Sequence, residues 1–136
     1  MKFPLKSIVY GLLTMVGLGL MTEAAKAKDQ KKTGRVLRHV VCFKFKENAK
    51  PAQIQHVEQE FAALKKKIPQ IRAFEMGTNN SPEGLDKGFT HCFVVTFGSE
   101  KDREIYLPHP AHKKFVSILK PILEDVFVID FWAGGD

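Results

Sequence analysis

Two histidines, two prolines and a tyrosine are concentrated in the ten residues YLPHPAHKKF, from Tyr106 to Phe115. Pro108 and Pro110 cannot both lie inside one regular helix, because proline lacks a backbone N–H and clashes with the preceding turn. The sequence therefore predicts that one helical piece ends near Leu107 and that a second begins at Pro110. We therefore expect the polar side chains at this break to line a pocket.

The break predicts specific chemistry for three of its side chains. His109 takes the N-cap position and His112 lies in the first turn, where the helix N-terminus carries partial positive charge. Lys113 and Lys114 adjoin it, so the charged imidazolium is disfavoured and His112 is expected to be neutral, as a general base must be. Tyr106 can donate its hydroxyl to a developing oxyanion. The alternative is purely structural, a capped helix kink with exposed histidines.

Hydrophobic periodicity predicts the elements that must position these residues. Residues 37–46 alternate and are rich in β-branched and aromatic residues, which predicts a strand. A helix is predicted from Pro51 until Pro69 ends the run. The remaining elements follow in chain order: strands over about 71–78 and 89–97, a helical region from Ser99 to about Lys120, and a strand over 126–132.

This order, β-α-β-β-α-β, is that of the ferredoxin-like split βαβ arrangement, an α+β fold. Right-handed crossovers place both helices on one face of a four-stranded antiparallel sheet. The face under the helices is expected to carry His39, Val41, Phe43, Phe45, Phe89, His91, Phe93, Val95, Phe97, Phe127, Ile129 and Phe131. The opposite face would carry Val40, Cys42, Cys92, Val94, Thr96, Val128 and Trp132.

That opposite face is too apolar to lie in water, and no predicted element remains to cover it. A second copy of the chain is the simplest cover, so we expect a homodimer through the open sheet face. The chain carries a formal net charge of +6 without a stripe of alternating basic and aromatic residues. Nucleic-acid binding is therefore not expected.

His39 and His91 interrupt the aromatic face near the starts of the first and third strands. If these neighbouring strands run in the same direction, the two histidines lie at matching depth and line a pocket with the helix break. Either histidine alone would more often be a satisfied core residue. The ligand-binding set predicted for an apolar or phenolic ligand is His39, His91, His109, Phe43 and Phe93. No carboxylate is evident among these residues, so no metal site is expected.

The same parallel arrangement would leave Cys42 and Cys92 two residues out of step. Their Cα atoms would then lie about 8 Å apart, beyond the usual disulfide reach of about 7 Å. An exported protein meets oxidising conditions, but this distance predicts free thiols.

The first 27 residues have the pattern of a secretory signal peptide. Lys2 and Lys6 precede an uncharged apolar run from Ile8 to Met21, and Ala25-Lys26-Ala27 supplies a cleavage site. A membrane-spanning helix needs about 20 apolar residues, which this run does not reach. The alternative is an uncleaved N-terminal anchor.

Cleavage after Ala27 would leave a protein with no membrane attachment, exported to the periplasm or secreted. Its residues 28–36 are polar and basic, which predicts a flexible linker. Residues 37–133 are then expected to form one compact domain.

Three segments carry a family resemblance: HVVCFKFK from His39, GTNNSPEGLDKGFTH from Gly77 to His91, and YLPHPAHKKF from Tyr106. Together they resemble the stress-responsive A/B barrel (Dabb) family of dimeric α+β barrels. The resemblance covers residues 37–132 and implies ferredoxin-like units that pair their sheets into a barrel with the helices outside. Members include heat-stable plant stress proteins and a cyclase that closes a linear polyketide by aldol condensation without a cofactor.

By resemblance to that cyclase, the pocket would be lined by His39, His91, Tyr106 and His112. His112 would remove an acidic C–H proton, and Tyr106 would stabilise the enolate or the carbonyl. The resemblance implies a cofactor-free lyase or cyclase that acts on an enolisable carbonyl compound. The alternative function is a non-catalytic, stress-associated dimer that binds a small ligand or is purely structural. Pro108, directly before the His-Pro pair, departs from the family pattern and tightens the kink.

Overall fold

The computed structural model describes residues 34–135, so the predicted signal peptide and most of the predicted linker lie outside the described residues. The elements in chain order are β1 (Val36–Phe45), α2 (Pro51–Lys67), β2 (Ala73–Thr78), β3 (His91–Phe97), α3 (Glu100–Tyr106), α4 (Pro110–Leu119) and β4 (Leu123–Ala133). None of the helices within residues 34–135 is long and apolar enough to cross a membrane.

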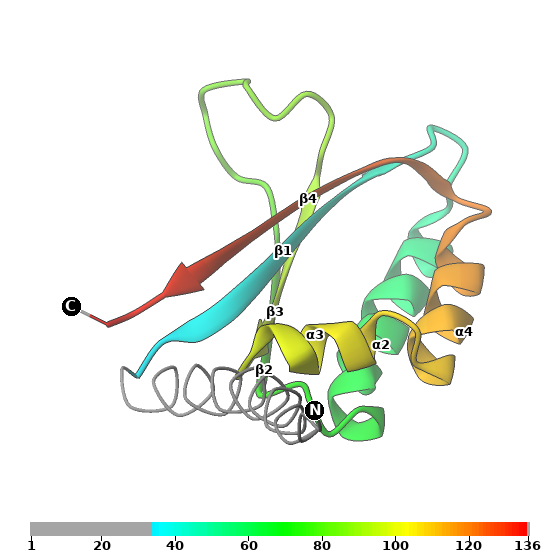
Figure 1. The fold of residues 1–136 in the computed structure, drawn as a ribbon. Coiled ribbons are helices and arrows are strands. Elements are labelled where there is room, and N and C mark those ends of the chain that lie inside the picture. Colours follow the sequence, from blue (N-terminus) through cyan, green and yellow to red (C-terminus); the bar gives the residue numbers. More distant parts are fainter. Residues whose placement is uncertain (1–33, 136) are drawn as a thin grey trace, which may run out of the picture.

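The four strands form one antiparallel sheet in the order β2-β3-β1-β4, and the helices lie on one face of it (Figure 1). This confirms the predicted ferredoxin-like α+β fold, with the second helical region divided into α3 and α4. The sheet is open, with β2 and β4 as its two edges. No helix or strand among residues 34–135 covers the face opposite the helices.

The helix break occurs where the two prolines predict it. Ser99 caps α3 by accepting a hydrogen bond of 3.1 Å from the backbone N–H of Asp102. α3 ends at Tyr106, and Pro110 is the first residue of α4. His109 is the N-cap of α4, as predicted, and its Nδ1 accepts from the backbone N–H of Ala111 at 3.1 Å.

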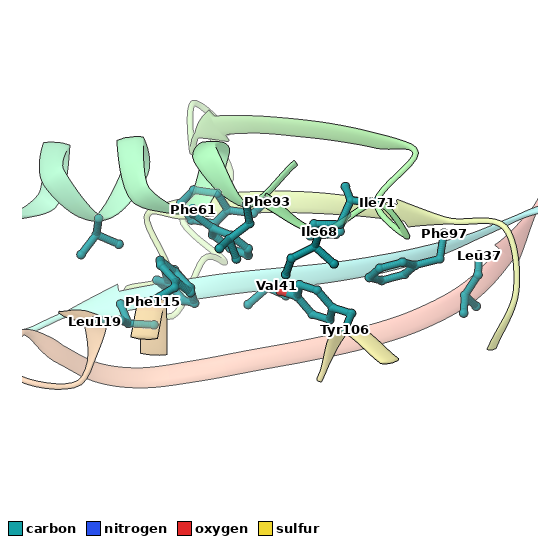
Figure 2. Close-up of a cluster of buried hydrophobic side chains, with 14 of the residues drawn as sticks. Leu37, Val41, Phe61, Ile68, Ile71, Phe93, Phe97, Tyr106, Phe115 and Leu119 are labelled. Atoms are coloured by element: carbon teal, nitrogen blue, oxygen red, sulfur yellow. The ribbon is translucent and has the colours of Figure 1, made fainter. Parts of the chain in front are cut away.

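An aromatic core joins the sheet to the helices (Figure 2). The ring of Phe61 on α2 lies 4.4 Å from the ring of Phe115 on α4 and 4.8 Å from the ring of Phe93 on β3, measured between centroids. Phe43 on β1 lies 4.9 Å from Phe93. Tyr106 belongs to the same buried layer, so the last residue of α3 is held by the core.

The directions of β1 and β3 differ from the sequence-based prediction. They pair antiparallel, with Phe43 opposite His91 and His39 opposite Val95. The topology requires this, because β3 is antiparallel to β2, and the crossover through α2 makes β1 parallel to β2. The prediction that His39 and His91 lie at matching depth is therefore wrong: they are offset by four positions, about 13 Å along the strand.

The two faces of β4 are also reversed relative to the prediction. Val126 is opposite Phe43 and Val128 is opposite Val41, so both lie on the helix side. The residues that face away from the helices are Phe127, Ile129 and Phe131, each about half exposed in the single chain. The segment VFVIDFW is apolar at almost every position, so it lacks the alternation that identifies a buried face.

The predicted separation of about 8 Å between Cys42 and Cys92 is wrong, because it assumed that β1 and β3 are parallel. With β1 and β3 antiparallel, Cys42 and Cys92 are direct partners in the register. Both are free thiols in the structure.

Candidate functional site

A cavity of about 610 Å³ lies between the helix break and the β1–β4 half of the sheet. Its lining is mainly apolar: Val41, Phe43, Phe61, Leu107, Phe115, Val116, Leu119, Leu123, Val126 and Val128. Its polar residues are His39, Arg103, Tyr106, His112, Lys120 and Asp130. An apolar cavity with a few convergent polar groups is the usual form of a small-molecule site.

Tyr106 is fully buried at the end of α3, and its hydroxyl has no hydrogen-bond partner among residues 34–135. Burial raises the pKa of this phenol above its ordinary value, so the hydroxyl keeps its proton and can donate. A buried donor without a partner costs free energy, and most such groups in native proteins are satisfied. Tyr106 is among the residues that line the cavity, so its phenol is a candidate hydrogen-bond donor at this site.

His112 lies next to the ring of Tyr106, with the two ring centroids 4.3 Å apart. Its Nδ1 is 2.9 Å from the carbonyl oxygen of Leu107. A carbonyl can only accept, so Nδ1 carries the hydrogen and Nε2 of the neutral ring carries the free lone pair. Leu107 supplies this carbonyl because the helix is interrupted there, which leaves the oxygen available to a side chain.

The pKa of His112 is lowered from its ordinary value, mainly because burial disfavours the imidazolium. Proximity to His39 and His109 lowers it further, and the hydrogen bond to Leu107 partly opposes the shift. The sequence also predicts a lowered pKa for His112, but it attributes the shift to the helix N-terminus and the neighbouring lysines. In the structure the main cause is burial in the cavity wall. The neutral ring with a free Nε2 is the form that accepts a proton.

His39 is buried on β1, with its ring centroid 5.9 Å from that of Tyr106. Its Nδ1 lies 2.7 Å from Oδ1 of Asp130 on β4, and Arg103 on α3 binds the other carboxylate oxygen. Because an ionised carboxylate only accepts, Nδ1 of His39 donates to it. The ring is thereby fixed in one orientation, with Nε2 left for other interactions.

Asp130 and Arg103 were missed in the sequence-based prediction. One signal could have identified Asp130: it is the single acidic residue in the otherwise apolar segment VFVIDFW. An acidic residue in a half-buried strand needs a partner, and the strand register makes His39 that partner.

His91 does not line this cavity. It lies near the other end of the sheet, where its Nε2 is 3.4 Å from Glu58 and its ring is 5.0 Å from that of Phe45. It borders a second cavity of about 580 Å³ that also involves Cys42 and Cys92. The antiparallel direction of β3 separates it from His39.

The other predicted ligand-binding residues divide between the cavity and the core. Phe43 lines the cavity, whereas Phe93 is fully buried behind it and is not among the lining residues. His109 caps α4 and is likewise not among them. The structure thus brings His39, Phe43, Tyr106 and His112 together, and it places His91, Phe93 and His109 elsewhere.

Within residues 34–135, no three His, Cys, Asp or Glu side chains are grouped so that they could hold a metal ion. The polar groups of the cavity are instead arranged as hydrogen-bond donors and acceptors. Tyr106 supplies a donor, and His112 supplies an acceptor at Nε2.

The sequence model of the family described as Stress responsive A/B Barrel Domain matches residues 37–133. The chain is 36% identical over 95 residues to the stress-response A/B barrel domain-containing protein HS1 of Arabidopsis thaliana, covering 70% of this chain and 87% of that protein. It is 26% identical over 95 residues to olivetolic acid cyclase of Cannabis sativa, covering 70% of this chain and 94% of the cyclase.

Two solved structures extend the comparison. A hydroxynitrile lyase from Passiflora edulis superimposes with a TM-score of 0.68 at 25% identity, covering 73% of this chain and 94% of the lyase. A ferredoxin-like protein from Bacteroides fragilis, described as dimeric and of unknown function, gives a TM-score of 0.58 at 26% identity. The match covers 71% of this chain and 94% of that protein.

Proposed function

The chain belongs to the stress responsive A/B barrel domain family, and we propose that it is a cofactor-free enzyme that removes a C–H proton from an enolisable carbonyl compound. The observation that carries this proposal is the buried hydroxyl of Tyr106, which has no hydrogen-bond partner among residues 34–135, on a ring that lies next to the neutral imidazole of His112. Relatives named olivetolic acid cyclase and hydroxynitrile lyase support an aldol-type cyclase or lyase reaction.

In the proposed reaction, the carbonyl oxygen of the substrate accepts a hydrogen bond from the hydroxyl of Tyr106. Nε2 of His112 takes a proton from the carbon next to that carbonyl, and the electron pair of the C–H bond moves into the enolate. Tyr106 stabilises the negative charge that develops on oxygen, an interaction that is stronger in an apolar cavity than in water. The imidazolium of His112 then returns the proton when the product forms.

His39 has a supporting role in this proposal. Asp130 holds its ring through Nδ1, so that Nε2 is available to orient a second polar group of the substrate. The rest of the cavity is apolar and has a volume of about 610 Å³. These features suit a small apolar or phenolic compound that carries a carbonyl group.

The chain is further proposed to act as a homodimer. Phe127, Ile129 and Phe131 lie on the open sheet face, each about half exposed, and apolar patches of this kind mark association surfaces. Ferredoxin-like neighbours from Bacteroides fragilis and Thermobifida fusca are described as dimeric. Export also remains a proposal, supported by the leader-like pattern of residues 1–27.

Exchange of α-hydrogens for deuterium in D₂O, followed by NMR, tests the proton-abstraction step without requiring the natural substrate. A panel of small methyl ketones and β-dicarbonyl compounds is incubated with the full chain. We expect exchange above the buffer rate, reduced by about 10²–10⁴-fold in His112→Ala and clearly reduced in Tyr106→Phe. The control is His56→Ala, which removes an exposed histidine of α2 and leaves exchange unchanged.

Saturable binding of these compounds without exchange would favour the non-catalytic alternative, a ligand-binding dimer. Exchange that is equal in the wild type, His112→Ala and Tyr106→Phe would contradict the assigned roles.

A further inference from the structure

Cys42 on β1 and Cys92 on β3 face each other across the two central strands of the sheet. Directly opposed residues in an antiparallel pair have Cα atoms about 4.5–5.5 Å apart, and their side chains lie on the same face. Disulfides join cysteines whose Cα atoms are about 4.4–6.8 Å apart. The strand register therefore places the Cα atoms of Cys42 and Cys92 within the range that disulfides span.

The two thiols differ in environment. Cys92 is exposed in the single chain, whereas Cys42 is half-buried. Burial, together with a hydrogen bond to the thiol of Cys92, raises the pKa of Cys42 to about 11. Cys92 is thus the sulfur that an external reagent reaches first. Cys42 lies opposite it in the register and would act as the second, resolving thiol.

We propose that Cys42 and Cys92 are a modification site at which a cross-strand disulfide forms by exchange with a small disulfide such as oxidised glutathione. The thiolate of Cys92 attacks one sulfur of glutathione disulfide, which forms a mixed disulfide and releases one glutathione thiol. The thiol of Cys42 loses its proton and attacks Sγ of Cys92, which releases the second glutathione thiol. Two protein thiols are oxidised, and one glutathione disulfide is reduced to two thiols.

This bridge would join the central strands in the lining of the second cavity, whose volume is about 580 Å³. That cavity is lined by Cys42, Cys92, Phe89 and Phe127 among others, and neither cysteine lines the cavity that contains Tyr106. The inference is therefore independent of the proposed enzymatic reaction. It concerns the sheet face that a second copy of the chain is proposed to cover.

The test compares how readily the bridge forms in the folded and unfolded chain. The full chain is equilibrated in glutathione buffers of graded redox potential, once in native buffer and once in concentrated urea. Thiols are then trapped by alkylation, and the Cys42–Cys92 peptide is quantified by mass spectrometry. Equilibrium is approached from the reduced and the oxidised side, so that slow access of glutathione to the thiols is not mistaken for the end point.

We expect the equilibrium constant for bridge formation to be at least about tenfold larger in the folded chain than in urea, because folding brings the two sulfurs together. A matched control is the double variant Cys92→Val, Val94→Cys. It keeps two cysteines on the same face but moves one by two positions, to a Cα separation of about 8 Å. This variant is expected to lose the native preference for the bridge.

A folded-state constant equal to or smaller than the constant in urea would overturn the proposal, because the native register would then not favour the bond. The same conclusion would follow if the double variant bridged as readily as the wild type in native buffer. Mixed glutathione disulfides on Cys92 without the internal bridge would also overturn it.

Discussion

Nδ1 of His39 lies 2.7 Å from Oδ1 of Asp130, which joins the central strand β1 to the edge strand β4 in the wall of the cavity. Arg103 of α3 binds the second oxygen of the same carboxylate. One side chain on an edge strand therefore orients a buried histidine and also attaches the helix that carries Tyr106. Asp130 contributes to the shape of the cavity through both partners.

Asp130→Asn should destabilise the fold, because it leaves Arg103 facing a neutral amide in a partly buried position. We expect the free energy of unfolding to fall by about 1–3 kcal/mol, measured by urea denaturation. The matched control is Asp125→Asn, which removes an exposed carboxylate from the same strand and should change stability by less than about 0.5 kcal/mol. Equal losses in the two variants would show that the His39–Asp130–Arg103 contacts contribute nothing specific.

Tyr106→Phe should separate stability from function. The hydroxyl is buried without a partner among the described residues, so its removal relieves a desolvation cost and keeps the ring in place. We expect the free energy of unfolding to stay the same or to rise by about 1 kcal/mol, while binding of carbonyl ligands weakens. Calorimetric melting and ligand titration measure the two effects. A variant less stable by more than about 1 kcal/mol would indicate that the hydroxyl already has a partner.

The lowered pKa of His112 predicts how stability depends on pH. The unfolded chain, with an ordinary histidine pKa of about 6.5, binds a proton before the folded chain does as the pH falls. Stability that is fully present above this pKa is therefore lost as the pH drops below it, towards the lower folded pKa. We expect His112→Gln to show a shallower loss of stability between about pH 7 and pH 5, measured by urea denaturation at each pH. Identical slopes for the two proteins would contradict the shifted pKa.

The sequence was sufficient to predict the order of the elements and the helix break. The two prolines act locally, so their effect at Leu107 and Pro110 does not depend on distant contacts. The position of β1 was also predictable from the sequence, because its buried and partly exposed residues alternate along the strand. These features have a local physical cause that one sequence displays.

The direction and facing of strands depend on partners that are distant in the chain. His39 meets Asp130 across 91 residues, and neither residue signals the other in the sequence. β4 is apolar on both sides, so periodicity could not show whether Phe127 or Val128 lies beneath the helices. The sequence predicted that Tyr106 and His112 line a common pocket, and both line the cavity at the helix break. It did not predict Asp130, which reaches the same cavity through the strand register.

Export can be tested independently of the fold. The basic start, apolar run and Ala25-Lys26-Ala27 site predict that the mature chain begins at Lys28. Expression in a bacterial host, followed by intact mass measurement of the periplasmic and cytosolic fractions, should show loss of residues 1–27 in the exported fraction. Ala27→Arg should block cleavage, because the site requires a small residue. A full-length mass in every compartment would contradict the prediction.

The open sheet face predicts that a single charge will separate a dimer into folded monomers. Phe131 is about half exposed on this face and opposite Arg38 in the register, so Phe131→Asp is tolerated in the single chain. Within a dimer the carboxylate would be buried against a second apolar face, and we expect the dissociation constant to rise by at least about 100-fold. Gln55→Asp adds the same charge to the exposed surface of α2 and should leave the dimer intact.

Light scattering coupled to size exclusion measures the mass, and circular dichroism verifies the fold. A wild-type chain that is monomeric at micromolar concentration, or a Phe131→Asp variant that remains dimeric, would show that this face is not the association surface.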